Sequence, residues 1–256
     1  MLKEKLKKIM GLSNVMYLRS FFPTKQEQKN RKIRKRFYSK LVTKDMLCFD
    51  AGANFGNRIQ PMLASGARVV AIEPQEECVK YLKRKYGKKI VIVAKGLDKV
   101  EGKKILYTAQ SHVLASFSES WIKVAQKERF NQYRWKKDHE IEMTTLDNLI
   151  GKYGKPYFIK IDVEGYEPEV LKGLSQPVSV LSFEYTVPEL NENLQTCFQR
   201  LNEIYSGNLV CNYSIGESMR WALPEWLSIR QMRELVQSEE FINTSFGDIY
   251  VRQHNN

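Results

Sequence analysis

Three acidic residues stand at the ends of apolar runs, and their spacing indicates where a ligand binds. Asp50, Glu73 and Asp162 each follow a short apolar run of the kind that forms a buried strand. In a parallel α/β sheet the carboxyl ends of the strands line the ligand crevice, so carboxylates there point at the bound molecule. Glu73 lies 21 residues beyond Gly52, a position from which a carboxylate accepts both hydroxyls of an unphosphorylated ribose. The pattern therefore predicts a ligand that contains a nucleoside.

The turn that follows Asp50 restricts the choice of ligand further. Gly52 and Gly56 bracket a tight turn that opens a helix, which brings backbone N–H groups up to a ligand. Their spacing differs from the G-x-G-x-x-G of pyrophosphate binders, and the Gly-Lys-Ser/Thr of a P-loop is missing. An acid just before the turn and Asn54 within it suit a zwitterionic ligand with an ammonium group. S-adenosylmethionine, in which an amino acid, a ribose and an adenine follow one another, is such a ligand.

A second acidic pair, Asp162 and Glu164, follows the strongly apolar run 157–161. If a bound S-adenosylmethionine gives its methyl group to a hydroxyl, the transfer is an in-line displacement in which positioning does most of the work, and a carboxylate can accept the hydroxyl proton. We expect the pair to act as proton acceptor and substrate orienter. The alternatives are that the two carboxylates hold a divalent cation, or that Glu164 caps the following helix. No metal is predicted, because the histidines and cysteines lack metal-ligand spacing.

Lys160 lies two residues before Asp162 in the same apolar strand, so both side chains share one face of the sheet. A buried lysine must be paired. We expect Glu184, at the end of the neighbouring strand, to be its partner, with Asp162 as the alternative. A structural ion pair is favoured over a direct catalytic role.

The elements that position these residues alternate between strand and helix for about 140 residues from residue 46 onward, which predicts a mostly parallel, doubly wound sheet. Residues 108–142 interrupt the pattern and are expected to form a partly helical surface excursion, where a lid over the substrate would lie. We expect a basic, helical N-terminal arm over residues 1–45 and one domain over residues 46–256. The expected strands of the sheet are 46–50, 68–73, 89–94, 157–161, 178–184, 208–213 and 248–252.

The net charge of +12 is concentrated in the arm, where residues 1–45 hold 14 Lys and Arg against 3 Asp and Glu. Such a block attracts nucleic acid, anionic lipid or acidic glycans, or is simply a solvated arm. Residues 1–22 form a loosely amphipathic basic pattern, which predicts contact with an anionic membrane surface through residues 1–40. Four cysteines without paired spacing favour a reducing compartment. We therefore expect a cytoplasmic protein, peripheral at the inner face of a membrane.

Several motifs resemble those of the FkbM-type methyltransferases over roughly residues 46–185. They are Phe49-Asp-Ala-Gly-Ala-Asn-Phe-Gly56, Ala71-Ile-Glu-Pro74, Thr145-Leu-Asp147 and Ile159-Lys-Ile-Asp-Val-Glu-Gly165. The resemblance implies a Rossmann-like methyltransferase fold, with helices on both faces of a mostly parallel seven-stranded sheet whose last strand is antiparallel. It also implies S-adenosylmethionine as cofactor and O-methylation, often of a sugar hydroxyl.

The resemblance further implies which residues contact the cofactor. Glu73 would hold the ribose, and Leu97 and Asp98 would lie along the adenine, with Asp98 accepting from its amino group. The residues that would hold the amino-acid end are Asp50, Gly52, Asn54 and Gly56.

The resulting prediction is an S-adenosylmethionine-dependent O-methyltransferase that acts on a hydroxyl of a saccharide, glycolipid or related small molecule. One alternative is a methyltransferase of RNA or other nucleic acid, recruited by the basic arm. Against it, an Asn-Pro-Pro-Tyr-like motif is missing after 157–161, and the sequence beyond residue 45 is nearly neutral, with 27 basic and 26 acidic residues. Another alternative is a non-catalytic cofactor-binding protein on the same fold, against which the intact acidic residues argue.

Overall fold

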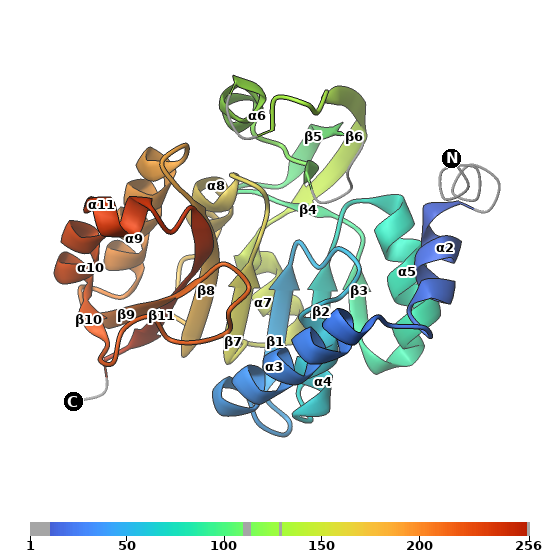
Figure 1. Ribbon diagram of the computed structural model, residues 1–256, viewed down its shortest axis with the longest axis horizontal. Coiled ribbons are helices and arrows are strands. Elements are labelled where there is room, and N and C mark those ends of the chain that lie inside the picture. The colour runs from blue at the N-terminus through green and yellow to red at the C-terminus, as the bar shows by residue number, and fades with distance from the viewer. Residues whose placement is uncertain (1–10, 110–113, 128–129, 255–256) are drawn as a thin grey trace. The chain divides into compact units, whose positions relative to one another are not determined.

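The computed structural model of the chain describes residues 11–109, 114–127 and 130–254 (Figure 1). The chain forms two compact units, the N-terminal unit Met1–Ala94 and the C-terminal unit Lys95–Asn256. The domain boundary expected after residue 45 stays a prediction. The start of the amphipathic segment expected over 1–22 lies outside the described residues.

The N-terminal unit contains a parallel sheet in which β2 lies between β1 and β3. All five residues of β1 are buried, as expected for a parallel strand that is covered on both faces. β1 pairs with β2 in a register that sets Ala51 opposite Ile72. The turns that follow these two strands therefore lie at the same edge of the sheet. The elements of this sheet are β1 (Leu47–Ala51), α4 (Ile59–Ala64), β2 (Arg68–Ile72), α5 (Glu76–Tyr86), the 3-10 helix η1 (Gly87–Lys89) and β3 (Val91–Val93).

Among the residues that the structure describes, two further helices precede this sheet, separated by a turn at Pro23. The helix α2 (Leu12–Arg19) packs against α5, and α3 (Lys25–Leu41) packs against α4 (Figure 1). Thr24 and Glu27 form a capping box at the start of α3, in which each side chain accepts from the other residue's backbone N–H. The basic segment is thus helical where it is described, and it is packed onto the unit. Among the described helices, none combines the length and the apolar character that crossing a bilayer requires.

The C-terminal unit contains a mixed sheet in the order β10-β9-β11-β8-β7. Its first two strands in the chain, β7 and β8, are parallel, and the final strand β11 runs antiparallel to both β8 and β9. The predicted α/β fold class with an antiparallel last strand is confirmed, and all seven expected strands are present. β10, a two-residue strand, is additional. The strands are β7 (Phe158–Ile161), β8 (Val180–Thr186), β9 (Leu209–Ile215), β10 (Leu227–Ser228) and β11 (Phe246–Gln253).

Helices connect the strands of this mixed sheet, and α8 packs against α9. Apolar residues recur on one side of α9, where Leu194, Phe198 and Leu201 are buried, as expected for a helix that covers a sheet. The helices are α7 (Leu146–Tyr153), α8 (Glu167–Lys172), α9 (Asn191–Ile204), α10 (Ile229–Leu235) and α11 (Glu239–Ile242).

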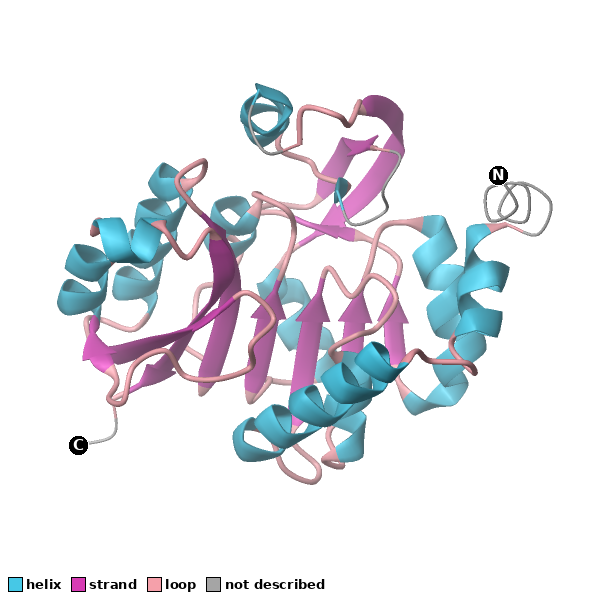
Figure 2. Cartoon of the chain, viewed as in Figure 1, coloured by secondary structure: helices cyan, strands magenta, loops and turns pink. Residues whose placement is uncertain are grey.

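The excursion expected over residues 108–142 is part of a small folded layer of the C-terminal unit that begins earlier in the chain, at residue 96 (Figure 2). It contains a three-stranded sheet in the order β4-β6-β5 and the helix α6 (Glu119–Lys127). Trp121 and Leu114 are buried in its own apolar cluster, against which Phe130 and Trp135 pack. Residues 110–113 and 128–129 lie outside the described part. The strands are β4 (Gly96–Leu97), β5 (Gly102–Thr108) and β6 (Lys136–Thr144).

Candidate functional site

The glycine turn after β1 depends on backbone conformations that favour glycine. Gly52 and Gly56 have φ angles of 80° and 74°, and Asn54 between them has a φ of 46°. A Cβ at Gly56 would lie 2.8 Å from the Tyr86 ring, whose hydroxyl donates a hydrogen bond to the Gly56 carbonyl at 3.0 Å. The N–H of Gly52 donates to the Ile72 carbonyl at 2.9 Å, which ties the turn to the end of β2.

Glu73 closes this turn from the neighbouring strand end. Its two carboxylate oxygens accept from the backbone N–H groups of Asn54 and Gln75, each at 2.7 Å. Burial raises the pKa of Glu73 to about 7, the negative charge of Asp50 raises it further, and the two backbone hydrogen bonds oppose the shift. In the N-terminal unit the structure therefore brings together all five residues predicted for the amino-acid and ribose ends of the cofactor.

The acidic residues at this turn fit S-adenosylmethionine as the ligand. Asp50 and Glu73 are each only 2% exposed, and two acidic groups that influence each other in a buried turn are disfavoured as a pair of anions. An ammonium group and two ribose hydroxyls would bring positive charge and further hydrogen-bond donors to this acidic pair. The fit is chemical, and the roles of the individual residues remain predictions.

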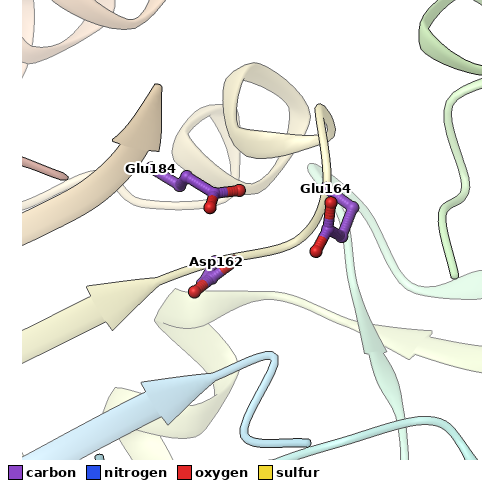
Figure 3. A group of neighbouring side chains, drawn as sticks. All are labelled: Asp162, Glu164 and Glu184. Carbon is purple, nitrogen blue, oxygen red and sulfur yellow. The ribbon is translucent and has the colours of Figure 1, made fainter. Parts of the chain in front are cut away.

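Three carboxylates of the C-terminal unit gather where two follow the end of β7 and the third lies within β8. Asp162, Glu164 and Glu184 each place one oxygen within 4.8 Å of the others' oxygens, and Figure 3 shows their side chains converging on one space. Asp162 and Glu164 were predicted as a functional pair, whereas Glu184 was predicted as the partner of Lys160, whose positive charge acts against the rise that burial causes in the pKa of Glu184. Three oxygens at this spacing match the ligands that divalent cations prefer, so the prediction that no metal is bound stays a prediction.

The proximity of these carboxylates changes their protonation. Burial, followed by the negative charges of Asp162 and Glu167, raises the pKa of Glu164 well above its ordinary value. Burial, followed by the charges of Asp162 and Glu164, raises the pKa of Glu184 in the same way. Both groups therefore favour the protonated form, in which a carboxyl donates a hydrogen bond instead of only accepting one.

Lys160 is fully buried beside these carboxylates. Its Nζ is 2.8 Å from Oδ1 of Asp248 and 3.3 Å from Oδ2 of Asp162, and it donates to the Ile161 carbonyl at 3.2 Å. The structure thus pairs Lys160 with the predicted alternative, Asp162, and with Asp248, which the sequence analysis missed. Asp248 belongs to this site because β11 pairs with β8 in a register that sets Asp248 opposite Glu184. The only sequence signal was a lone acid in an apolar final strand.

The loop that carries Glu164 has a strained backbone. Glu164 has a φ of 53°, in the left-handed region that a side chain other than glycine rarely adopts. The buried carboxylate of Glu167 accepts from the N–H groups of Val163 at 3.0 Å and Gly165 at 3.4 Å. Burial raises the pKa of Glu167 to about 7. Glu167 was not predicted as a site residue, but its carboxylate holds this loop in place.

The excursion and α9 hold the carbonyl side of the same loop. The Ser116 hydroxyl donates to the Glu164 carbonyl at 2.7 Å, and the Asn193 amide donates to the Gly165 carbonyl at 3.0 Å. A Cβ at Gly165 would lie 2.6 Å from the Trp121 ring, so the loop also touches the apolar cluster of the excursion. The carboxylate of Glu164 is therefore positioned from both sides.

Asp98, predicted to accept from the adenine, is already engaged within the C-terminal unit. Its carboxylate accepts from the Lys99 N–H at 2.7 Å and the Tyr166 hydroxyl at 3.1 Å, and it forms an ion pair of 2.8 Å with Lys104. Leu97 before it is 3% exposed. A carboxylate has about four lone-pair positions, so these three donors leave little capacity for an adenine amino group, and that role stays a prediction.

Solved structures with similarity to this chain include several methyltransferases. A TehB-like SAM-dependent methyltransferase from Corynebacterium glutamicum is 7% identical, with a TM-score of 0.46 and coverage of 86% of this chain and 87% of that one. A precorrin-6y C5,15-methyltransferase from Geobacter metallireducens is 10% identical, with a TM-score of 0.45 and coverage of 88% and 87%. A putative methyltransferase from Streptococcus mutans, in complex with SAH, is 12% identical, with a TM-score of 0.41 and coverage of 87% and 96%.

A comparison with curated protein sequences finds no match. The sequence model of the Methyltransferase FkbM domain, in contrast, matches residues 50–221. That segment is more than half of the chain and contains both the glycine turn and the three carboxylates. The predicted class, an S-adenosylmethionine-dependent methyltransferase, is thereby confirmed, and the chain belongs to the FkbM methyltransferase family.

Proposed function

We propose that this enzyme transfers a methyl group to a hydroxyl of a saccharide, glycolipid or related small molecule. The observation that carries the proposal is the group of three carboxylates at Asp162, Glu164 and Glu184. Sugars present several neighbouring hydroxyls, and a set of carboxyl groups in mixed protonation states offers both acceptors and donors to them. When bound, S-adenosylmethionine supplies an electrophilic methyl group to this chemistry.

Asp162 is the proposed proton acceptor. Its side chain is 30% exposed, while its partner Lys160 is fully buried. The ion pair with Lys160 therefore orients the carboxylate, and the exposed part of the side chain remains accessible to an acceptor. A positioned carboxylate that takes the hydroxyl proton as the new bond forms contributes about 10²- to 10⁴-fold to the rate. Glu164 and Glu184, whose pKa values are raised, donate hydrogen bonds to further oxygens of the acceptor and so orient it.

The N-terminal unit is proposed to hold the methyl donor. Glu73 would accept from the ribose hydroxyls, and Asp50 would pair with the ammonium group. The turn from Gly52 to Gly56, with Asn54 within it, is proposed to hold the amino-acid end. Leu97 and Asp98 remain proposed for the adenine.

The basic segment at residues 1–40 is proposed to recruit the acceptor by binding the anionic inner surface of a membrane. An RNA acceptor is the second candidate, because the exposed face of α3 is basic. RNA-dependent activity that falls steeply with added salt would favour that candidate.

Two measurements test the proposal. Isothermal titration with S-adenosylmethionine should show binding to the wild-type chain, and absence of binding would reject the assignment of the donor site. Incubation with labelled S-adenosylmethionine and fractionated cell extract, followed by mass spectrometry, should then identify a labelled hydroxyl compound. Label found only in nucleic acid or protein would reject the proposed acceptor class.

A further inference from the structure

The turn between α2 and α3 exposes two aromatic side chains. Phe21 is 60% exposed and Phe22 is 80% exposed, and Leu18 before them is 46% exposed. Phenylalanine is usually buried, and exposed apolar groups that lie together mark surfaces that bind a protein or a membrane. This apolar turn, defined here as Leu18, Phe21 and Phe22, is not used by the proposed chemistry.

The apolar turn is fixed on the folded N-terminal unit. The N–H groups of Phe21 and Phe22 donate to the carbonyls of Leu18 and Arg19 at 3.2 and 3.0 Å. The Phe21 ring meets Tyr17 edge to face at a centroid distance of 5.0 Å. Arg84 of α5 lies 4.0 Å from the centre of the same Tyr17 ring. Because the backbone of the turn and the Phe21 ring are held in place before any partner arrives, binding costs less conformational entropy.

A basic face begins directly after the apolar turn. Five of the exposed cations of α3 recur at spacings of three or four residues, which places them along one side of the helix. Phe37 and Tyr38 of the same helix are buried, so α3 is packed on one side and charged on another. Glu27 is the acidic residue of α3. The exposed cations that form this basic face are Lys25, Lys29, Lys32, Arg36 and Lys40.

We propose that the apolar turn inserts into the surface of an anionic lipid bilayer, with the basic face of α3 against the lipid headgroups. Apolar side chains buried at the boundary of the acyl chains, together with cations that attract anionic lipids, are the two contributions that hold a peripheral protein on a membrane. This inference gives a location and a partner to the recruitment proposed above, on which it rests.

Other occupants fit this surface less well. A second copy of the chain would bring an equal basic face and would be repelled by it. A nucleic acid would pair with the cations, and its bases could stack on the aromatic rings. It has no comparable use for the aliphatic side chain of Leu18 in the same patch.

Vesicle flotation of the full chain tests the inference. Wild-type protein should float with vesicles of phosphatidylcholine and phosphatidylserine and should float far less with phosphatidylcholine alone. The double variant Phe21→Ser/Phe22→Ser should partition at least about tenfold more weakly. The matched control is Phe246→Ser, which removes another exposed phenylalanine, 42% exposed on β11, and should bind as the wild type does. Replacing Lys29 and Lys32 by Gln should weaken binding to the anionic vesicles.

Three outcomes would overturn the inference. One is equal flotation of the double variant and the wild type. Another is a Phe21- and Phe22-dependent dimer in gel filtration, and the third is Phe21- and Phe22-dependent binding of single-stranded RNA without flotation. Circular dichroism shows whether each variant is folded. Binding of S-adenosylmethionine is measured in parallel, so failure of flotation with retained cofactor binding rejects the membrane surface and leaves the proposed methyl transfer standing.

Discussion

The buried carboxyl group of Glu73 should make the free energy of unfolding of the cofactor-free chain depend on pH. Its pKa is about 7 in the folded chain, against an ordinary value of 4.5. Between these two pH values the folded chain keeps a proton that the unfolded chain has released. The stabilisation is therefore fully present below pH 4.5, declines as the pH rises and is lost by the time the pH passes 7. The difference between the two pKa values corresponds to about 3 kcal/mol.

Comparison with Glu73→Gln isolates this contribution, because glutamine does not ionise. The amide has one carbonyl oxygen, so one of the two N–H groups that Glu73 satisfies loses its acceptor, at a cost of about 1–3 kcal/mol at every pH. The wild type loses stability between pH 5 and pH 8 as Glu73 ionises, and the variant does not. Over this range the free energy of unfolding of the variant should therefore rise by about 2.5 kcal/mol relative to that of the wild type.

Urea unfolding followed by far-ultraviolet circular dichroism at several pH values measures this shift. The matched control is Ile72→Val, at the neighbouring buried position, which should lower stability by about 1 kcal/mol equally at each pH. Parallel pH profiles for wild type and Glu73→Gln would refute the reasoning, because they would mean that Glu73 keeps its ordinary pKa in the fold.

Three further substitutions test the carboxylate group and its loop. Asp162→Asn should lower turnover by about 10²- to 10⁴-fold and leave cofactor affinity in calorimetry nearly unchanged; a loss mainly of affinity would reassign Asp162 to the cofactor. Lys160→Met should destabilise the fold by about 3–5 kcal/mol in urea unfolding, because its buried carboxylate partners lose their cation; an unchanged midpoint would contradict the ion pair. Gly165→Ala should cost about 1–3 kcal/mol, since its Cβ would meet Trp121, whereas Gly151→Ala, where a Cβ meets nothing within 4 Å, should be neutral or stabilising.

Local sequence signals were sufficient for the strands and for the glycine turn. Mostly apolar segments of five to seven residues marked each of the seven expected strands. The spacing from Gly52 to Glu73 placed the acid at the end of β2, where the structure has it. These features follow from short-range rules of chain geometry, in which the turn and the two strands that it joins are close in the sequence.

Contacts between distant segments were not predictable in the same way. Asp248 reaches Lys160 only through the pairing of β11 with β8, and the register of two strands more than sixty residues apart leaves no local signal. Asp98 was read as a free acceptor, although Lys104 and Tyr166 occupy it. The strand β6 was hard to recognise because its first five residues are all exposed and lack alternation.

The contact of Ser116 and Trp121 with the Glu164–Gly165 loop has a consequence for protein engineering. The excursion is a segment that could be exchanged between relatives in order to change the acceptor. Its replacement would remove a hydroxyl that anchors the strained residue and a ring that fills the space above the glycine. A graft that preserves activity must therefore carry over both of these side chains, so acceptor range and acid–base geometry will be inherited together.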